Sequence, residues 1–206
     1  HKTEYHYDRY VSLSPHIIRL RPAPHSRTPI EAYSLKIKPE NHFINWQQDP
    51  HGNFFARFVF PEKTDELRIE VDLIANLEVF NPFDFFTESF AEKFPFAYPD
   101  DLIDELVTFM KPEPAGPLMR AYLGALSKGE QPTIDMLVEL NARLQREISY
   151  VIRMDPGVQT VEETLRLRSG SCRDSAWLLV QIARHIGLAA RFVSGYLIQL
   201  TPDVKA

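Results

Sequence analysis

The spacing of apolar residues changes once along the chain, and this change limits the possible folds more than any other feature. Before about residue 80, apolar and polar residues alternate, as at Leu67, Ile69 and Val71, which is the period of a half-buried strand. Beyond about residue 100, apolar residues recur at the spacing of an amphipathic helix. The sequence therefore predicts an α+β protein, in which an antiparallel β domain precedes a helical part.

Four further stretches of aromatic and β-branched residues support the β domain. They span residues 5–11, 16–20, 33–37 and 54–60, and turn-forming segments such as PAPHSRTP and DPHGN separate them. Short strands with turns between them are typical of an antiparallel β-sandwich. We expect a first domain at residues 1–111, which includes a connector, and a second domain at residues 112–206.

The connector is the phenylalanine-rich segment VFNPFDFFTESFAEKFPFAYP, which holds half of the 14 phenylalanines in the chain. Its apolar residues follow neither a helical nor an alternating period, so we expect it to pack as an irregular segment. The alternative is an exposed aromatic patch that binds a partner, because contiguous apolar surface is costly without one.

The helical part contains several predicted elements. Helices are expected at residues 100–110, 117–127, 133–150, 160–168 and 172–186, followed by an apolar strand at residues 190–200. Thr160 and Glu163 form a T-x-x-E capping box at the start of the fourth helix. Gly187 is a stop signal for the fifth helix.

Composition excludes several classes of protein. No stretch approaches the roughly 18 apolar residues that span a bilayer, and the first residues lack the apolar region of a secretory signal, so we expect a cytoplasmic protein without a membrane partner. The net charge is -5, with an excess of three basic residues in 1–60 and of ten acidic residues in 61–114. This distribution does not predict a nucleic-acid partner. One cysteine cannot form an internal disulfide.

That cysteine, Cys172, lies in SGSCRDSAWLLVQIARHIG at the predicted start of a helix. Free backbone N–H groups and the helix dipole stabilise a thiolate there, and the amides of Cys172 and Arg173 could also donate to an oxyanion. A nearby carboxylate, Asp174, opposes the thiolate, and its simplest role is to complement the positive helix terminus, with direct catalysis as the alternative. A buried, unreactive cysteine is the competing interpretation of Cys172.

A catalytic thiol also needs a base. The only histidine after Cys172 is His185, which at about 1.5 Å per residue lies nearly 20 Å along the same helix and cannot reach the thiol. The six other histidines are scattered at irregular spacing, so metal binding through them is a weak alternative; they are His1, His6, His16, His25, His42 and His51. No calcium-binding loop motif occurs, and no cofactor is expected.

Residues 162–197, EETLRLRSGSCRDSAWLLVQIARHIGLAARFVSGYL, resemble the cysteine segment of the transglutaminase-like superfamily. The shared landmarks are Gly170, Cys172, Asp174, Gly187, Ala190, Arg191, Val193, Gly195 and Tyr196. Residues 1 to about 110 resemble the N-terminal region of bacterial transglutaminase-like proteins, in HIIRLRPAPHSRTPI, NHFINWQQDPHGNFFARFVFP and NPFDFF. The resemblance implies that Cys172 is a nucleophile in an incomplete, papain-like α+β core, with Gly170, Asp174 and Tyr196 as supporting residues.

The resemblance also implies a histidine and an aspartate on strands that follow the cysteine segment, and this sequence has neither there. We therefore expect an inactive fragment, truncated before the triad is complete, whose unpaired strand at 190–200 allows self-association. The intact protein would cleave or transfer amide bonds of a protein or peptide substrate, as a cysteine peptidase, amidase or transglutaminase. The alternative is a non-catalytic interaction module that uses the β domain and the connector.

Overall fold

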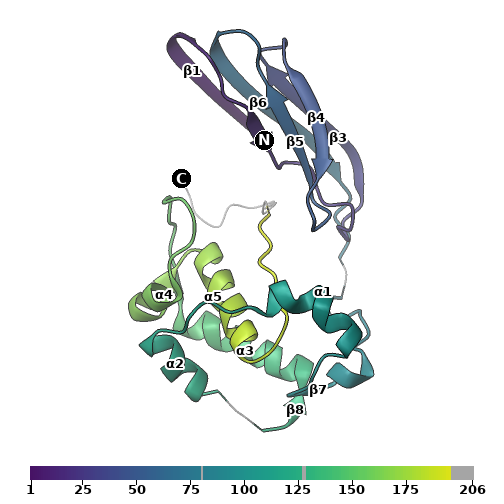
Figure 1. Ribbon diagram of the computed structural model, residues 1–206, viewed down its shortest axis with the longest axis vertical. Coiled ribbons are helices and arrows are strands. Elements are labelled where there is room, and N and C mark those ends of the chain that lie inside the picture. Colours follow the sequence, from purple (N-terminus) through teal and green to yellow (C-terminus); the bar gives the residue numbers. More distant parts are fainter. Residues whose placement is uncertain (80, 127–128, 196–206) are drawn as a thin grey trace. The chain divides into compact units, whose positions relative to one another are not determined.

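The computed structural model describes residues 1–79, 81–126 and 129–195 (Figure 1). The chain divides into two compact units, His1–Asp84 and Phe85–Ala206. This division lies within the phenylalanine-rich segment, earlier than the domain boundary expected after residue 111. The reason is that the later part of the segment contributes strand β7, Lys93–Phe94, which pairs with β8, Gln131–Pro132, in the second unit.

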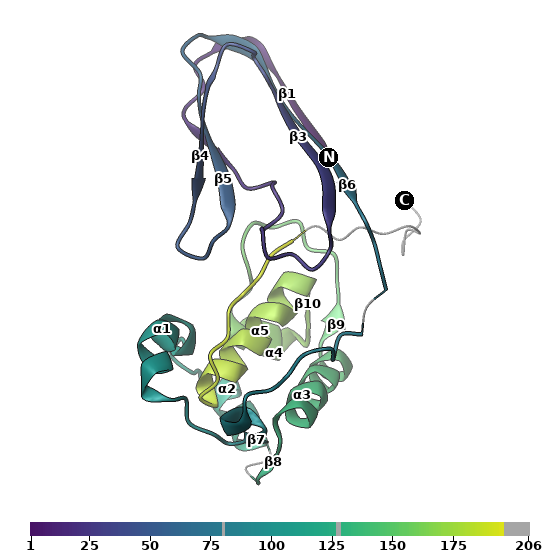
Figure 2. The same cartoon turned by 90° about the vertical axis from the view of Figure 1, so that its right-hand side faces the viewer.

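The first unit consists of two three-stranded antiparallel sheets, which form two layers in Figure 2. One sheet has the order β1 (Lys2–Val11), β6 (Thr64–Ala75) and β3 (Ile30–Lys38). The other has the order β2 (His16–Ile18), β5 (Phe54–Val59) and β4 (Phe43–Gln48). The predicted antiparallel, sandwich-like domain is therefore confirmed.

Both sheets contribute to one core. Its buried residues are Ile18, Ile37, Ala56, Phe58, Phe60 and Leu67. Strand β4 was not predicted, because every one of its residues is exposed and the strand therefore shows no alternation of buried and exposed positions. It is the outer strand of its sheet, where only one neighbour is needed.

The second unit is mainly helical. It contains a 3-10 turn at Ser89–Ala91 and helices α1 (Asp100–Met110), α2 (Pro117–Gly124), α3 (Thr133–Glu147), α4 (Val161–Leu167) and α5 (Cys172–His185). All five predicted helices are present, and their ends differ from the predictions by three residues or fewer. A two-residue parallel pair joins β9 (Ser149–Tyr150) to β10 (Ser169–Gly170) just before α5.

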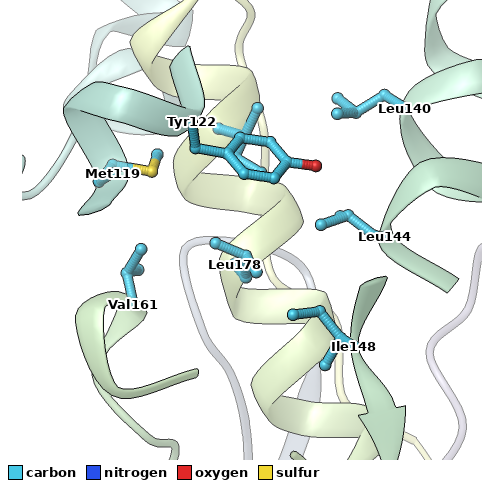
Figure 3. Packing of buried hydrophobic residues seen from close by; sticks show 8 residues of the cluster. Met119, Tyr122, Leu140, Leu144, Ile148, Val161 and Leu178 are labelled. Atoms are coloured by element: carbon cyan, nitrogen blue, oxygen red, sulfur yellow. The ribbon is translucent and has the colours of Figure 1, made fainter. Parts of the chain in front are cut away.

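Helix α5 is the centre of the second core. Leu178 and Ile182 are fully buried on it, and Figure 3 shows side chains from α2, α3 and α4 gathered around Leu178. The neighbouring helices contribute Met119, Tyr122, Leu140, Leu144 and Val161. Burial of these side chains fixes the helix, and with it the position of its first residue. None of the helices in the described ranges is long and apolar enough to cross a bilayer.

The last described segment differs from its prediction. Residues 190–195 form no strand, and the rest of the predicted strand at 190–200 lies outside the described residues. The chain there is tied to helices instead: the Ala190 N–H donates to the Phe109 carbonyl at 3.0 Å, and Arg184 Nε donates to the Ala190 carbonyl at 3.0 Å. Self-association through this segment remains a prediction.

The phenylalanine-rich segment packs in part. Phe90, Phe96 and Tyr98 form edge-to-face ring contacts with one another in the second unit. Phe83 and Phe86, by contrast, are exposed. Its described residues are mostly irregular, but they include the 3-10 turn at Ser89–Ala91 and strand β7, which were not predicted. The use of its exposed rings by a partner remains a prediction.

Candidate functional site at the start of α5

Cys172 is the first residue of α5, and its side chain is exposed. A cysteine kept for packing alone would be buried among apolar side chains. The structure therefore contradicts the interpretation of Cys172 as a buried core residue. The thiol lies where a helix terminus meets solvent, which is a position that allows chemistry.

The start of α5 is held by a closed capping box between Ser171 and Asp174. The Ser171 backbone N–H and the Ser171 hydroxyl each donate to Asp174 Oδ2 at 2.7 Å. The Asp174 backbone N–H returns a bond to the Ser171 side chain. This box satisfies backbone groups on either side of Cys172 and so orients the residue between them. Sequence analysis missed it, although S-x-x-D in this position was a usable signal.

Asp174 is also the acceptor for more distant donors. Arg153 makes a two-point contact with it, Nε to Oδ2 and one terminal nitrogen to Oδ1, both at 3.0 Å. The Gln159 backbone N–H donates to Oδ1 at 2.7 Å. Asp174 is only 1% exposed, so these bonds take the place of the water molecules that would hydrate an exposed carboxylate.

This environment fixes the charge of Asp174. Burial raises its pKa, but hydrogen bonds from Arg153, Gln159 and Ser171 outweigh burial and hold the pKa well below the usual range. The same contact raises the pKa of Arg153. Asp174 is therefore ionised at neutral pH, and its oxygens are engaged by Arg153, Gln159 and Ser171. Its position supports the helix-terminus role that the sequence favoured.

The loop before α4 is bound to the same helix terminus. Arg153 donates to the Gly157 carbonyl at 2.7 Å, within the loop itself. Arg173 reaches back from the first turn of α5 and donates to the carbonyls of Arg153 and Asp155, each at 3.2 Å. The Arg173 side chain therefore binds the loop, whereas its backbone N–H has no acceptor among the described residues.

Gly170 allows this close packing. A Cβ atom at Gly170 would lie 2.8 Å from Asp174 Cβ and 3.2 Å from Gln159 Oε1, which is too close without movement. The Gly170 carbonyl also accepts from the Val151 N–H at 3.0 Å beside the β9–β10 pair. The predicted supporting role of Gly170 is therefore a steric one, since a side chain would displace Asp174.

The helix terminus offers free donors. Among the described residues, no acceptor is hydrogen-bonded to the backbone N–H of Cys172 or of Arg173, as expected for the first positions of a helix. These groups could donate to an anionic oxygen that forms next to the thiol. The predicted oxyanion residues, Cys172 and Arg173, are thus placed together at one terminus.

The second unit holds one histidine, His185, and it is too far from Cys172 to act as its base. Cys172 begins α5 and His185 ends it, so about 20 Å of helix separates them. The remaining histidines belong to the first unit. Tyr196, the other predicted supporting residue, lies outside the described residues. Within the described part of the chain, no three His, Cys, Asp or Glu side chains lie close enough to hold a metal ion.

Comparison with known protein families gives two matches along the chain. Residues 1–76 match the bacterial transglutaminase-like N-terminal region. Residues 120–204 match the transglutaminase-like superfamily core, and this range contains the Cys172 site. One match therefore lies in each compact unit, and residues 77–119 lie between the two matches.

Individual proteins and a solved structure are also similar to this chain. Proteins of Mycobacterium tuberculosis and Mycobacterium bovis, each named an uncharacterized protein, are 27% identical over 209 residues, which covers all of this chain and 67% of theirs. The crystal structure of a "putative cysteine protease" from Cytophaga hutchinsonii has a TM-score of 0.57 and 16% identity. It covers 90% of this chain, which spans 61% of that protein, and it shows a shared fold.

Proposed function

Because the chain belongs to the transglutaminase-like superfamily, we propose that Cys172 is the nucleophile of a thiol enzyme that acts on amide bonds. The observation that carries this proposal is the geometry at the start of α5. An exposed thiol occupies the first helical position, beside two backbone N–H groups without acceptors among the described residues. The buried Ser171 and Asp174, together with the partly buried Arg153, form a hydrogen-bonded network that supports this geometry.

In the proposed reaction, the thiolate sulfur forms a bond to the amide carbonyl carbon, and the N–H groups of Cys172 and Arg173 bind the oxygen that becomes negative. The carbon–nitrogen bond then breaks, and the amine leaves with a proton from a general acid. Water or a second amine displaces the thiol from the acyl-enzyme. Water as acceptor makes the protein a peptidase or amidase, and an amine makes it a transglutaminase.

The general acid and its orienting partner are the unassigned parts of the mechanism. We propose that a histidine and an aspartate from outside residues 1–206 complete the site, because His185 is at the far end of α5. The greater length of the relatives supports this proposal. The alternative is a histidine of the first unit, His1–Asp84, which we call the β unit. A protein or peptide substrate and a cytoplasmic location are also proposed.

The proposal is tested with the full-length gene product and with residues 1–206 side by side. Purified protein is incubated with a peptide library and, separately, with a glutamine-containing protein and a fluorescent primary amine. Cleavage by the full-length product identifies a peptidase, and labelling identifies a transferase. Cys172→Ala should abolish either activity, while its circular dichroism and melting temperature stay unchanged, because the side chain is exposed.

Two outcomes would contradict the proposal. Undiminished turnover by Cys172→Ala would exclude the thiol as nucleophile. Thiol-dependent turnover by residues 1–206 alone would show that a histidine of this chain completes the site, and single substitutions of the six histidines of the β unit would then identify it.

A further inference from the structure

The β unit contains a large open cavity, lined by residues between Arg21 and Phe54, that has no part in the chemistry proposed for Cys172. Its volume is about 870 Å³, and it lies between the edge strands β3 and β4 of the two sheets and the loop at residues 22–29. Aromatic and aliphatic side chains form much of its lining, including Tyr33, Ile44, Trp46 and Phe54. A cavity of this size accommodates several residues of a peptide.

One cation in the lining is positioned by aromatic rings. The Arg21 guanidinium carbon lies 4.3 Å from the centre of the Phe54 ring, 5.3 Å from that of Trp46 and 5.7 Å from that of Tyr33. Aromatic rings attract a guanidinium without using its N–H groups, which stay available to an acceptor. Among the described residues, Arg21 makes no hydrogen bond or ion pair with an acceptor, and it is exposed to solvent.

Arg19, two residues earlier in the same unit, is an arginine that has an anionic partner. Its guanidinium carbon lies 4.8 Å from the centre of the Phe55 ring, and its terminal nitrogen lies 3.7 Å from an Asp49 carboxylate oxygen. Arg19 therefore has both a ring and an anion, whereas Arg21 has rings alone. The cavity also contains one acidic residue, Glu31, which forms no ion pair with Arg21. An anion from outside the chain could therefore take at Arg21 the place that Asp49 takes at Arg19.

The two strands beside the cavity are suited to an extended partner. Within the described residues, β3 and β4 each pair on one side only, so each has a free edge of backbone donors and acceptors. Ile44 is 45% exposed and Trp46 is 39% exposed on β4. An added strand would satisfy the edge, cover these side chains and present its own side chains to the cavity.

We propose that this cavity binds an extended peptide segment that carries a carboxylate side chain against Arg21 and an apolar side chain against Trp46. The carboxylate would accept two N–H bonds from the guanidinium, which is the geometry that arginine provides best. The site belongs to the β unit and needs no reaction at Cys172. It therefore goes beyond the proposed thiol chemistry and can be tested without it.

The test uses three pools of immobilised nine-residue peptides with Glu, Gln or Lys fixed at the centre and mixed residues elsewhere. We expect the full chain to retain the Glu pool about tenfold better than the Gln pool, and the Lys pool least. The chain has a net charge of -5, so general electrostatic attraction would favour the Lys pool instead. Equal retention of the three pools, or a preference for Lys, would overturn the proposal.

Matched variants locate the site. Arg21→Gln should remove the preference for Glu, whereas Arg19→Gln, which changes the net charge equally, should keep it. Cys172→Ala should also keep it, so failure of the thiol proposal would leave this result unchanged. A chain with Trp177→Phe retains Trp46 as its one tryptophan, and its fluorescence should shift on addition of the Glu pool. An unchanged spectrum, or equal losses in Arg21→Gln and Arg19→Gln, would reject the cavity as the site.

Discussion

Helices α4 and α5 begin eleven residues apart with the same type of residue before the first turn, yet the two starts are built differently. At α4, the Thr160 hydroxyl accepts from the Glu163 N–H at 3.2 Å in an exposed position. At α5, Ser171 and Asp174 close a reciprocal box that is buried. The start of α5 is joined to the loop before α4 through Arg153. The start of α4 is joined instead to the start of α2, because the first-turn residue Glu162 accepts from the N–H groups of Leu118 and Met119.

The difference shows that the position of the α5 start is fixed by more buried contacts than that of the α4 start. The cap of α4 satisfies one backbone donor, which is enough to start a short helix. The network at α5 places both oxygens of Asp174 between three residues and buries them, at the cost of removing a charge from water. Such a network is stable only when complete, and it positions Cys172. The following predictions test this contrast, from the largest effect to the smallest.

The largest effect is expected for Asp174→Ala. The substitution leaves the Arg153 charge and several donors without their acceptor, so the free energy of unfolding should fall by about 3–5 kcal/mol. Glu163→Ala, at the corresponding position of α4, should cost at most about 1 kcal/mol. Urea unfolding curves of both variants measure the difference. Equal losses would show that the buried network contributes no more to the free energy of unfolding than the exposed cap does.

A second, smaller effect is expected on acidification. The folded-state pKa of Asp174 is lowered, so this residue contributes stability that is complete above the usual carboxyl pKa of about 4 and is lost as the pH falls from there toward the folded-state pKa. The loss should be smaller than for Asp174→Ala, because a protonated carboxyl still fills the space.

The matched control for acidification is Asp174→Asn, which has no carboxyl group to titrate. The free energies of unfolding of the wild type and of Asp174→Asn should differ most at neutral pH and converge as the pH falls below about 4. A difference that stays constant between pH 7 and pH 3 would show that Asp174 does not titrate differently in the folded chain.

The next effect is expected for Gly170→Ala. The new Cβ would lie 2.8 Å from Asp174 Cβ, so the helix start must shift and the free energy of unfolding should fall by about 1–3 kcal/mol. Gly124→Ala is the control, because no atom lies within 4 Å of its new Cβ and alanine favours the helix. Thermal melts distinguish them; a neutral Gly170→Ala would mean that the packing against Asp174 is loose.

Much of this site could be predicted from the sequence, and the missing part has one physical cause. The helix range and the terminal position of Cys172 follow from local patterns, namely apolar spacing and turn residues. The partnership of Arg153 with Asp174 spans 21 residues, and no local pattern encodes it. The predicted capping box at Thr160 and Glu163 is half formed: the Glu163 N–H donates to the Thr160 hydroxyl, and no return bond to the Glu163 side chain occurs among the described residues.

The β unit shows the same limit. Alternation predicted the strands that have one buried face, but it missed β4, whose residues are exposed on both faces. The strand expected at 190–200 is absent over 190–195, and contacts to α1 and α5 satisfy the backbone N–H and C=O of Ala190 instead. Strand formation depends on a neighbour that an apolar run alone does not specify.

The smallest effect is expected for Thr160→Ala, which removes the single side-chain cap of α4. The hydroxyl accepts one bond from the Glu163 N–H at 3.2 Å, and water can replace it because the bond is exposed. The free energy of unfolding should therefore fall by about 0.5–1 kcal/mol, toward the lower limit for helix caps. Thr160→Ser keeps the hydroxyl and should restore most of the loss. Hydrogen exchange adds a local measurement: protection should decrease for the first amides of α4 and stay unchanged at the start of α5, where the Ser171–Asp174 box remains closed. If protection fell equally at both starts, the two caps would form one cooperative unit, and the contrast between a local cap and a buried network would be wrong.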